Sequence, residues 1–247
     1  MKAVGIIPVR LESSRLPEKA LKDICGLPMI VHTALRANMS KKLSEVYVAT
    51  DNKKIKDTVE SFGIDVIMTS KDHKNSSERA AEACKELDAE IIVNIQGDEP
   101  LLYPEHIDII TAPILSDESI KVCLGITEFN KRNSYSDCKA AVDLDGNLLY
   151  TSRSDIPHYY RKTEFPLWKL CFIVPHRKEI LEKYLEWEPT PLEIIEDNHF
   201  LRLLEHGIPI KTFKVEEGKI SVDTKEDLEE VRELMLKDKF LSSYVDG

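Results

Sequence analysis

Three fixed positive charges and two hydroxyls fall within one ten-residue stretch that follows the first apolar run of the chain. They belong to Arg10, Ser13, Ser14, Arg15 and Lys19. Arginine offers forked donors, lysine a compact charge and serine a hydroxyl, so the set suits a ligand with several phosphates. The stretch has no glycine and no Gly-Lys-Ser/Thr ending, so it is neither a Walker motif nor a dinucleotide fingerprint. We expect a phosphate-binding loop of another kind; the alternative is an ordinary charged surface loop.

Two carboxylates occupy positions where the chain leaves a predicted strand. Asp98 follows a strand predicted at 90–95, in which Ile91–Val93 form a continuous apolar run, and Gly97 before it lets the backbone turn sharply. Magnesium binds one or two carboxylates and completes its shell with phosphate oxygens and water, so Asp98 near a phosphate-binding loop predicts a Mg²⁺ site. Asp223 lies at another strand-to-helix junction. Taken alone, it is more typical of a helix cap.

A third polar cluster runs from Asp72 to Arg79, into a predicted helix. Ser76 and Arg79 have the chemistry to hydrogen-bond a base or a ribose. Spacing alone favours the simpler reading, a helix cap followed by first-turn charges.

The histidines give no metal-binding pattern, because no pair has the spacing of zinc ligands. His32 lies in an apolar helical pattern and is expected in the core. The others considered are expected at the surface: His106, His158, His176 and His206. Trp168 and Trp187 are interpreted as packing or dimer contacts.

The elements that position these residues follow an alternating pattern over the first half of the chain. Strands are predicted at 3–9, 46–49, 65–68, 90–95 and 122–126, and helices at 28–37, 53–62, 76–87 and 104–115. Such alternation is typical of an α/β fold with a mostly parallel sheet. Ligands of these folds bind at the carboxyl ends of the strands, where both the basic stretch and Asp98 are expected.

The pattern changes after about residue 127. Residues 138–150 predict a hairpin that turns at Asp145-Gly146, and 153–168 an irregular excursion, interpreted as a dimerisation or lid element. Later predictions are helices at 177–185 and 192–204, a strand at 208–215, and a last helix from Thr224 with a capping box to Asp227. No linker divides the chain, so we expect a single domain over 1–247 with an excursion at roughly 128–176.

Composition limits the possible functions. The 247 residues include 34 Lys and Arg and 44 Asp and Glu, a net charge of −10. This acidic balance argues against broad nucleic-acid binding, although a local basic cluster can still hold a small anion. No apolar run approaches the roughly 20 residues that span a bilayer, and the first residues are too short and strand-like for a signal peptide. We therefore expect no membrane partner and a cytoplasmic location.

The five cysteines do not suggest cross-links. Their number is odd, their spacing is wide, and no C-x-x-C pair occurs. This pattern argues against a disulfide framework and against a zinc site, and Cys84 and Cys123 are expected as small buried apolar residues.

Nine segments, in order along nearly the whole chain, resemble the 3-deoxy-manno-octulosonate (Kdo) cytidylyltransferases. They are IIPVRLESSRLPEKAL (6–21), GLPMIVHT (26–33), VYVATDN (46–52), DHKNSSERAAE (72–82), IIVNIQGDEP (91–100), LLYTSRSDIP (148–157), LEWEPTPLEIIE (185–196), LRLLEHG (201–207) and SVDTKEDLE (221–229). The resemblance implies a Rossmann-like three-layer α/β nucleotidyltransferase fold with an inserted hairpin and dimerisation excursion. It also implies a homodimer that transfers CMP from CTP to Kdo or a related acidic sugar, with Mg²⁺, and releases pyrophosphate.

The resemblance further implies roles for individual residues. Those implied to bind CTP are Arg10, Ser13, Arg15, Lys19, Thr50, Asp51, Ser76, Arg79 and Gln96. Those implied to bind the acceptor are Gln96, Arg153, Glu193 and Glu196. Asp98 and Asp223 are implied as metal ligands, and Asp98, Lys19 and Arg15 as the catalytic groups.

The chain departs from the family pattern at two places. Glu18 stands where the family has glycine in RLPGKPL, and we expect its carboxylate to point away from the triphosphate. On the acceptor side, polar family residues are replaced by Leu170, Phe172, His199 and Phe200. A site that loses hydrogen-bond partners loses affinity for the corresponding hydroxyls, so the acceptor is less firmly implied than the nucleotide.

Other functions therefore stay open at this point. One is cytidylyl transfer to an amino-sugar variant, a phosphonate or a phosphate. Another is a nucleotide-sugar glycosyltransferase, which also uses a carboxylate-bound metal but needs no triphosphate site. The third is a non-catalytic nucleotide-binding protein.

Overall fold

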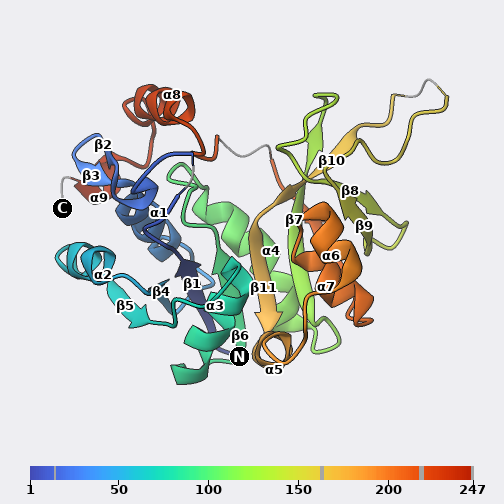
Figure 1. Cartoon of the computed structure of the whole chain (residues 1–247), viewed down its shortest axis with the longest axis horizontal. Coiled ribbons are helices and arrows are strands. Elements are labelled where there is room, and N and C mark those ends of the chain that lie inside the picture. The colour runs from blue at the N-terminus through green and yellow to red at the C-terminus, as the bar shows by residue number, and fades with distance from the viewer. Residues whose placement is uncertain (14, 162–163, 217–219, 246–247) are drawn as a thin grey trace.

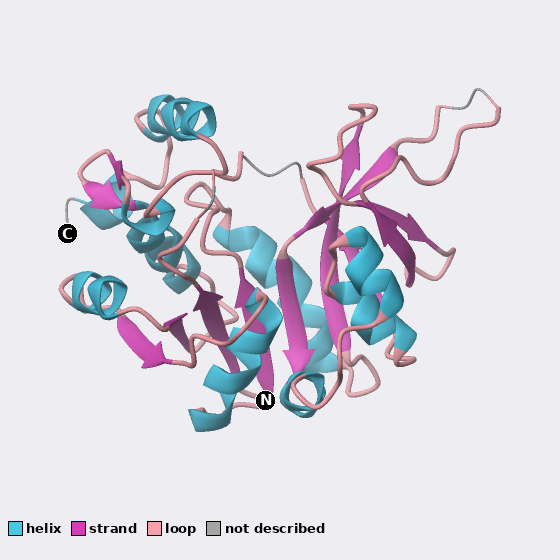
Figure 2. Ribbon diagram, in the orientation of Figure 1, coloured by secondary structure: helices cyan, strands magenta, loops and turns pink. Residues whose placement is uncertain are grey.

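The computed structural model describes residues 1–13, 15–161, 164–216 and 220–245. A large sheet runs through the molecule and helices cover both of its faces, so the fold has three layers (Figure 1). The strand order is β5-β4-β1-β6-β11-β7-β10-β8-β9, and β12 also pairs with β7. Figure 2 shows the strands in magenta and the helices in cyan. The predicted α/β class is confirmed.

The strands and helices have the following bounds. The strands are β1 (Ala3–Pro8), β2 (Asp23–Ile24), β3 (Leu27–Pro28), β4 (Glu45–Thr50), β5 (Asp65–Met68), β6 (Ile91–Ile95), β7 (Val122–Phe129), β8 (Lys139–Val142), β9 (Leu148–Ser152), β10 (Leu167–Cys171), β11 (Ile173–Arg177) and β12 (Ile210–Lys214). The helices are α1 (Met29–Asn38), α2 (Lys53–Glu60), α3 (Ser76–Ala83), α4 (Pro104–Ser116), α5 (Lys178–Tyr184), α6 (Pro191–Glu196), α7 (Phe200–Glu205), α8 (Lys225–Met235) and α9 (Ser242–Val245).

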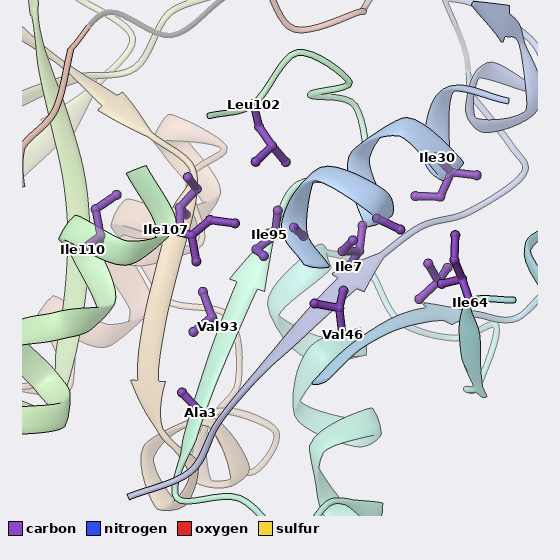
Figure 3. Packing of buried hydrophobic residues seen from close by; sticks show 14 of the residues in the cluster. Ala3, Ile7, Ile30, Val46, Ile64, Val93, Ile95, Leu102, Ile107 and Ile110 are labelled. Carbon is purple, nitrogen blue, oxygen red and sulfur yellow. The ribbon is translucent and has the colours of Figure 1, made fainter. Parts of the chain in front are cut away.

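The core explains why β1 and β6 lie in the middle of the sheet. Both strands are buried along their whole length, and successive side chains point to opposite faces. Ile7 and Val93 belong to the cluster that includes Ile30 of α1 and Ile107 of α4 (Figure 3). Side chains on the other face pack against α3 and α5. The parallel pairing of β1 with β4 and with β6 brings the ends of these strands to one edge, where the polar loops follow.

Most predicted elements are present within one or two residues of their expected bounds. The hairpin β8–β9 turns at Asp145-Gly146, where Gly146 has the positive φ of 82° that glycine tolerates. The capping box at Thr224 and Asp227 is also confirmed.

Two predictions for the second half were wrong or incomplete. The helix predicted over 192–204 is two short helices, because Asp197 adopts a left-handed conformation with φ of 49° and ends α6. The strands β10 and β11 were not predicted. They run antiparallel to their neighbours, and β11 enters the sheet between β6 and β7.

The histidine predictions were partly wrong. His32 is a satisfied core residue, since its Nε2 lies 2.7 Å from the Ile24 carbonyl oxygen and its Nδ1 lies 3.0 Å from the Tyr244 hydroxyl. His106 and His176 are buried rather than exposed, because His106 lies among the buried residues of α4 and His176 lies in β11, which is buried along its whole length. His158 and His206 are exposed as expected.

The remaining features of composition have simple outcomes. All five cysteines are free thiols, and Cys84 and Cys123 are buried. Trp187 stacks on His206 with ring centroids 4.1 Å apart, and the Lys214 ammonium lies over the Trp168 ring. Among the described residues, no helix is both long and apolar enough to cross a bilayer.

Candidate active site

A cavity of about 400 Å³ opens at the carboxyl ends of β1 and β6. This volume lies within the usual range for small-molecule sites. The positive side chains that line it are Arg10, Arg15, Lys19, Lys74 and Arg79, and the negative ones are Glu12, Asp98, Asp197 and Asp223. The five cations exceed the four carboxylates by one, so the cavity has a small positive excess in a protein whose net charge is −10. Such a local excess attracts anionic ligands.

The structure brings the two predicted metal ligands together on one lysine. Lys19 Nζ lies 2.8 Å from Asp98 Oδ2 and 3.0 Å from Asp223 Oδ1. Burial by itself lowers the Lys19 pKa, but the two carboxylates outweigh burial and raise the pKa above its ordinary value. The ammonium therefore stays charged at neutral pH. Arg15 adds a second cation, with Nη2 3.1 Å from Asp223 Oδ1.

Asp223 is not the cap of α8. The Thr224 hydroxyl accepts the Asp227 amide hydrogen, and the Asp227 carboxylate accepts the amide hydrogens of Asp223 and Thr224. The cap is thus complete without the Asp223 side chain, which faces the cavity instead. The reading of Asp223 as a cap, which the spacing favoured, is wrong for this reason.

Backbone contacts hold the two acidic segments side by side. The Val222 amide donates to the Asp98 carbonyl oxygen at 2.9 Å. Gly97 lies close to the end of β1, and a methyl group added there would lie 3.2 Å from Ile30 Cδ1 and 3.3 Å from the Pro8 carbonyl oxygen. Glycine is therefore required at position 97 because the backbone passes close to β1 and α1, and not because of a positive φ.

The predicted nucleotide residues lie on the α3 side of the cavity. Gln96 Nε2 donates to Ser76 Oγ at 3.0 Å, and both residues line the cavity. Arg79 also lines it, donates to the Ser70 carbonyl oxygen and lies 3.5 Å from Asp51 Oδ1.

The other residues predicted to bind the nucleotide lie partly in the cavity lining and partly beside it. Arg10 and Ser13 are part of the cavity lining, but Ser14 lies outside the described residues. Thr50 is fully buried at the end of β4, and its hydroxyl accepts the Asn52 amide hydrogen. Within the described part of the chain, neither Thr50 nor Asp51 is a lining residue, so Asp51 reaches the cavity only through Arg79.

Three predicted acceptor residues lie behind the cavity rather than in its lining, as far as the described chain extends. Glu196 accepts hydrogen bonds from the Ser152 hydroxyl and the Arg153 amide. The Arg153 guanidinium donates to the Glu196 carbonyl oxygen and lies 3.3 Å from the Asp197 carboxylate. Glu193 forms a buried ion pair with Arg202. Direct contact of these three residues with an acceptor stays a prediction.

Three of the four acceptor-side departures from the family pattern pack in the core. Leu170 is buried, and Phe172 stacks on buried Phe200 with ring centroids 6.0 Å apart. Only His199 of this group is found among the lining residues of the described chain. Its Nε2 is buried and has no hydrogen-bond partner within the described structure. The altered acceptor side is therefore largely a repacked core with one new polar residue at the cavity.

Glu18 points away from the cavity, as expected. Its carboxylate binds the Lys54 ammonium at 2.7 and 2.8 Å. Glu18 also has a left-handed backbone with φ of 53°, which glycine adopts more readily. The backbone conformation thus accounts for the glycine that the family carries at this position.

Some lining residues had no predicted role of their own. His73, Lys74 and Asn75, which precede α3, were recognised only as members of the polar cluster 72–79, and Asp197, which follows α6, was not singled out. The Asp197-Asn198 pair inside a helical pattern is a local signal of a break, because both residues tolerate turn conformations. No comparable signal marks Lys74.

The donor set suits magnesium. Two carboxylates meet at one point beside two cations, Lys19 and Arg15, and Mg²⁺ bound to a nucleotide needs only one or two protein carboxylates. No group of three or more His, Cys, Asp or Glu side chains gathers in a metal-binding arrangement over the described ranges. The chemistry therefore fits a cation that arrives with phosphates rather than a closed protein site.

The fold has three layers, with a cation-lined cavity at the strand ends and two carboxylates that converge in it. This is the arrangement of a nucleotidyltransferase. The family model described as Cytidylyltransferase matches residues 4–239. The chain belongs to this family of cytidylyltransferases. Membership favours nucleotidyl transfer over the glycosyltransferase and non-catalytic alternatives.

Similar proteins agree with this assignment. The chain is 38% identical to 3-deoxy-manno-octulosonate cytidylyltransferase of Geobacter sulfurreducens, with 94% of this chain and 99% of the relative covered. It is 40% identical to the enzyme of that name from Neisseria gonorrhoeae, with 93% and 96% covered. A solved structure of CMP:2-keto-3-deoxy-manno-octonic acid synthetase complexed with CTP superposes with a TM-score of 0.93, at 35% identity, over 96% of this chain and 99% of that one.

Proposed function

We propose that the protein transfers CMP from CTP to Kdo or a closely related ulosonic acid and releases pyrophosphate. The observation that carries the proposal is the convergence of Asp98, Asp223, Lys19 and Arg15 at one end of the cavity. Relatives that carry this activity by name cover nearly the whole chain at 37–40% identity.

The basic loop supplies the charge that the triphosphate requires. Arg10, Arg15 and Lys19 line the cavity, and arginine in particular binds phosphate oxygens with paired donors. Ser76, Gln96 and Arg79 lie on the α3 side and have the donors needed for cytosine and ribose. We assign the base to that side and the triphosphate to the loop.

The acceptor hydroxyl attacks the α-phosphorus in line, the bond to the bridging oxygen breaks, and pyrophosphate leaves. The protein contributes positions and charges, since such transfers need little covalent chemistry from side chains. Lys19 and Arg15 neutralise the charge that develops on the leaving group. Mg²⁺ held by Asp98 and Asp223 would polarise the α-phosphate and lower the pKa of the attacking hydroxyl.

The acceptor is expected between Gln96 and the segment 197–199. Gln96, Asp197 and His199 all line that part of the cavity. Because His199 is the lining residue that departs from the family pattern, it is the position most able to alter the preference among acids. Glu196 and Arg153 support the same segment from behind.

We also propose a homodimer in the cytoplasm. Large apolar side chains are exposed on α6, on the β8–β9 hairpin and on the excursion, which is the kind of surface that a partner covers. They include Ile194, Ile195, Leu144, Leu149, Tyr160 and Phe165. Five free thiols suit a reducing compartment, where CTP is also available.

The test is pyrophosphate release from CTP and Mg²⁺ with a panel of acceptors. The panel contains Kdo, other ulosonic acids, an amino-sugar variant, and phosphonate and phosphate compounds. We expect release with Kdo or another ulosonic acid and little with ATP, GTP or UTP in place of CTP. Release only with a phosphonate or phosphate would replace the proposed acceptor, and no release with any member would contradict the function.

A further inference from the structure

We propose that Arg202 is a positioning residue that fixes the spacing between two walls of the cavity. The nucleotide wall is the segment 73–76, and the acceptor wall is the segment 197–199. Both segments contribute lining residues. The inference rests on the proposed function, because the spacing between the walls sets how the acceptor meets the nucleotide.

Arg202 is almost completely enclosed, with 2% of its side chain exposed. Its Nε and Nη2 donate to the two oxygens of Glu193 at 2.6 and 2.7 Å, and its Nη1 donates to the Trp187 carbonyl oxygen. The guanidinium lies 4.2 Å from the centroid of the Tyr184 ring. All three guanidinium nitrogens therefore donate hydrogen bonds, and one face of the guanidinium plane packs on an aromatic ring.

One connection runs from Arg202 to the nucleotide wall. Arg202 Nη2 lies 3.2 Å from Glu78 Oε1, within α3. The other oxygen of Glu78 accepts the Lys74 amide hydrogen at 2.7 Å, and the Asn75 side chain donates to Glu78 Oε1. Asn75 in turn caps α3 by accepting the Glu78 amide hydrogen. Arg202 thus fixes Glu78, and Glu78 in turn fixes the nucleotide wall through Lys74 and Asn75.

A second connection runs to the acceptor wall. The Tyr184 hydroxyl lies 3.3 Å from Glu193 Oε1 and 3.4 Å from the His199 carbonyl oxygen. Glu193 belongs to α6, which ends at Asp197, and α7, which carries Arg202, begins directly after His199. The acceptor wall is therefore the short connection between two helices that Arg202 and Glu193 join.

Stability alone gives a weak reason for this arrangement. Burying one guanidinium and two carboxylates is costly, and apolar residues of similar size are often as stabilising. What the charged network adds is geometry, because the guanidinium fork permits only one mutual placement of Glu78 and Glu193. Lysine keeps the charge but lacks the fork, so it cannot reproduce that placement.

Glu193 was predicted to bind the acceptor directly. In this proposal it acts through Arg202 instead, in agreement with a side chain that is only 9% exposed and is not among the cavity-lining residues of the described chain.

The test compares Arg202→Lys with Arg177→Lys. Arg177 is also buried and donates to the Ile114, Asp117 and Ile120 carbonyl oxygens, but it lies at the opposite end of β6, beside Ile91. Arg202→Lys should speed amide exchange in both walls at least about 10-fold and lower kcat at least about 10-fold, while the Kd for CTP changes less than about 3-fold. Arg177→Lys should leave exchange in both walls and kcat near wild type.

A second variant separates the two connections and guards against a folding failure. Glu78→Gln should speed exchange at 73–76 and leave 197–199 unchanged, because it removes only the link to the nucleotide wall. Equal exchange and equal kcat in Arg202→Lys and Arg177→Lys, or no effect of Glu78→Gln on 73–76, would overturn the proposal. Exchange does not depend on an acceptor, so these results stand even if the acceptor panel contradicts the proposed function.

Discussion

Asp98 and Asp223 bind the same ammonium group, 2.8 and 3.0 Å from Lys19 Nζ, although Asp98 follows β6, Asp223 precedes α8 and the two lie far apart in the sequence. The hydrogen bond from the Val222 amide to the Asp98 carbonyl oxygen fixes this meeting in the backbone as well. The two carboxylates form a negatively charged spot next to the cations Lys19 and Arg15. A nucleotide that binds with a divalent cation needs both, because the carboxylates can bind the cation and the positive side chains can bind the phosphates.

The first prediction concerns charge at this point. Asp98→Asn and Asp223→Asn should each lower turnover at least about 100-fold, comparable to removal of another preorganised electrostatic group. Pyrophosphate release measures the effect, and Asp145→Asn, at the exposed hairpin turn, serves as the control. Near-normal release by Asp98→Asn would remove the basis for its metal role.

The second prediction concerns close packing beneath Asp98. Gly97→Ala introduces a methyl group 3.2 Å from Ile30 Cδ1 and 3.3 Å from the Pro8 carbonyl oxygen, so the loop that carries Asp98 must shift. Misplacement of a catalytic group is costly, and we expect kcat to fall about 10-fold or more. Gly207→Ala is the control, because it strains a positive φ of 72° but meets nothing near the cavity. Equal kcat in both variants would contradict the steric argument.

The third prediction concerns the backbone at Glu18. Glycine relieves the left-handed conformation, whereas alanine removes the same Lys54 contact and keeps the conformational cost. Glu18→Gly should therefore melt roughly 2 to 4 °C above Glu18→Ala. Thermal unfolding followed by circular dichroism measures the difference. Identical melting temperatures would show that the positive φ carries no cost here.

The fourth prediction concerns pH and His176. Burial lowers the pKa of this histidine from 6.5 to about 4, and its Nδ1 lies 2.8 Å from the Val174 carbonyl oxygen. Above pH 6.5 the imidazole is neutral in both the folded and the unfolded chain, so its titration has no effect. As the pH falls from 6.5 towards 4, only the unfolded chain gains the proton, and the free energy of unfolding decreases.

Between pH 7 and pH 5, His176 should account for a loss of about 2 kcal/mol. His176→Phe should lack this part of the pH dependence, whatever its stability at pH 7. Urea unfolding at the two pH values measures the comparison. Parallel pH profiles for wild type and variant would contradict the lowered pKa.

The sequence predicts the first half of the fold well because its elements are periodic and local. The run Ile91–Ile95 and the cap at Asn75 both indicate structure through neighbouring residues alone. The antiparallel strand β11 could not be anticipated in the same way, because its place between β6 and β7 depends on pairing with residues distant in the sequence. Asp197 breaks a helix through a backbone conformation that periodicity does not detect.

The site residues likewise divide into those that local sequence predicts and those that depend on distant contacts. The basic loop and Asp98 are recognisable because each directly follows a strand, and the sheet then brings them to one edge. Asp223 looked like a cap because it directly precedes a predicted helix, although the capping box of Thr224 and Asp227, itself predicted from the sequence, leaves no capping role for it. The acceptor role of Glu193 was implied by the family resemblance alone, and its ion pair with Arg202 could not be anticipated because it depends on the turn that brings α7 back to α6.

The central claim is that Asp98 and Asp223 hold a divalent cation beside the triphosphate of CTP. A crystal structure with CTP and Mn²⁺, read by anomalous scattering, tests it directly. We predict a Mn²⁺ peak about 2.1 Å from an oxygen of each carboxylate and from an oxygen of the triphosphate, with Lys19 turned towards the phosphates. CTP bound in the cavity with Mn²⁺ absent from both carboxylates, or with Lys19 still between them, would contradict the claim.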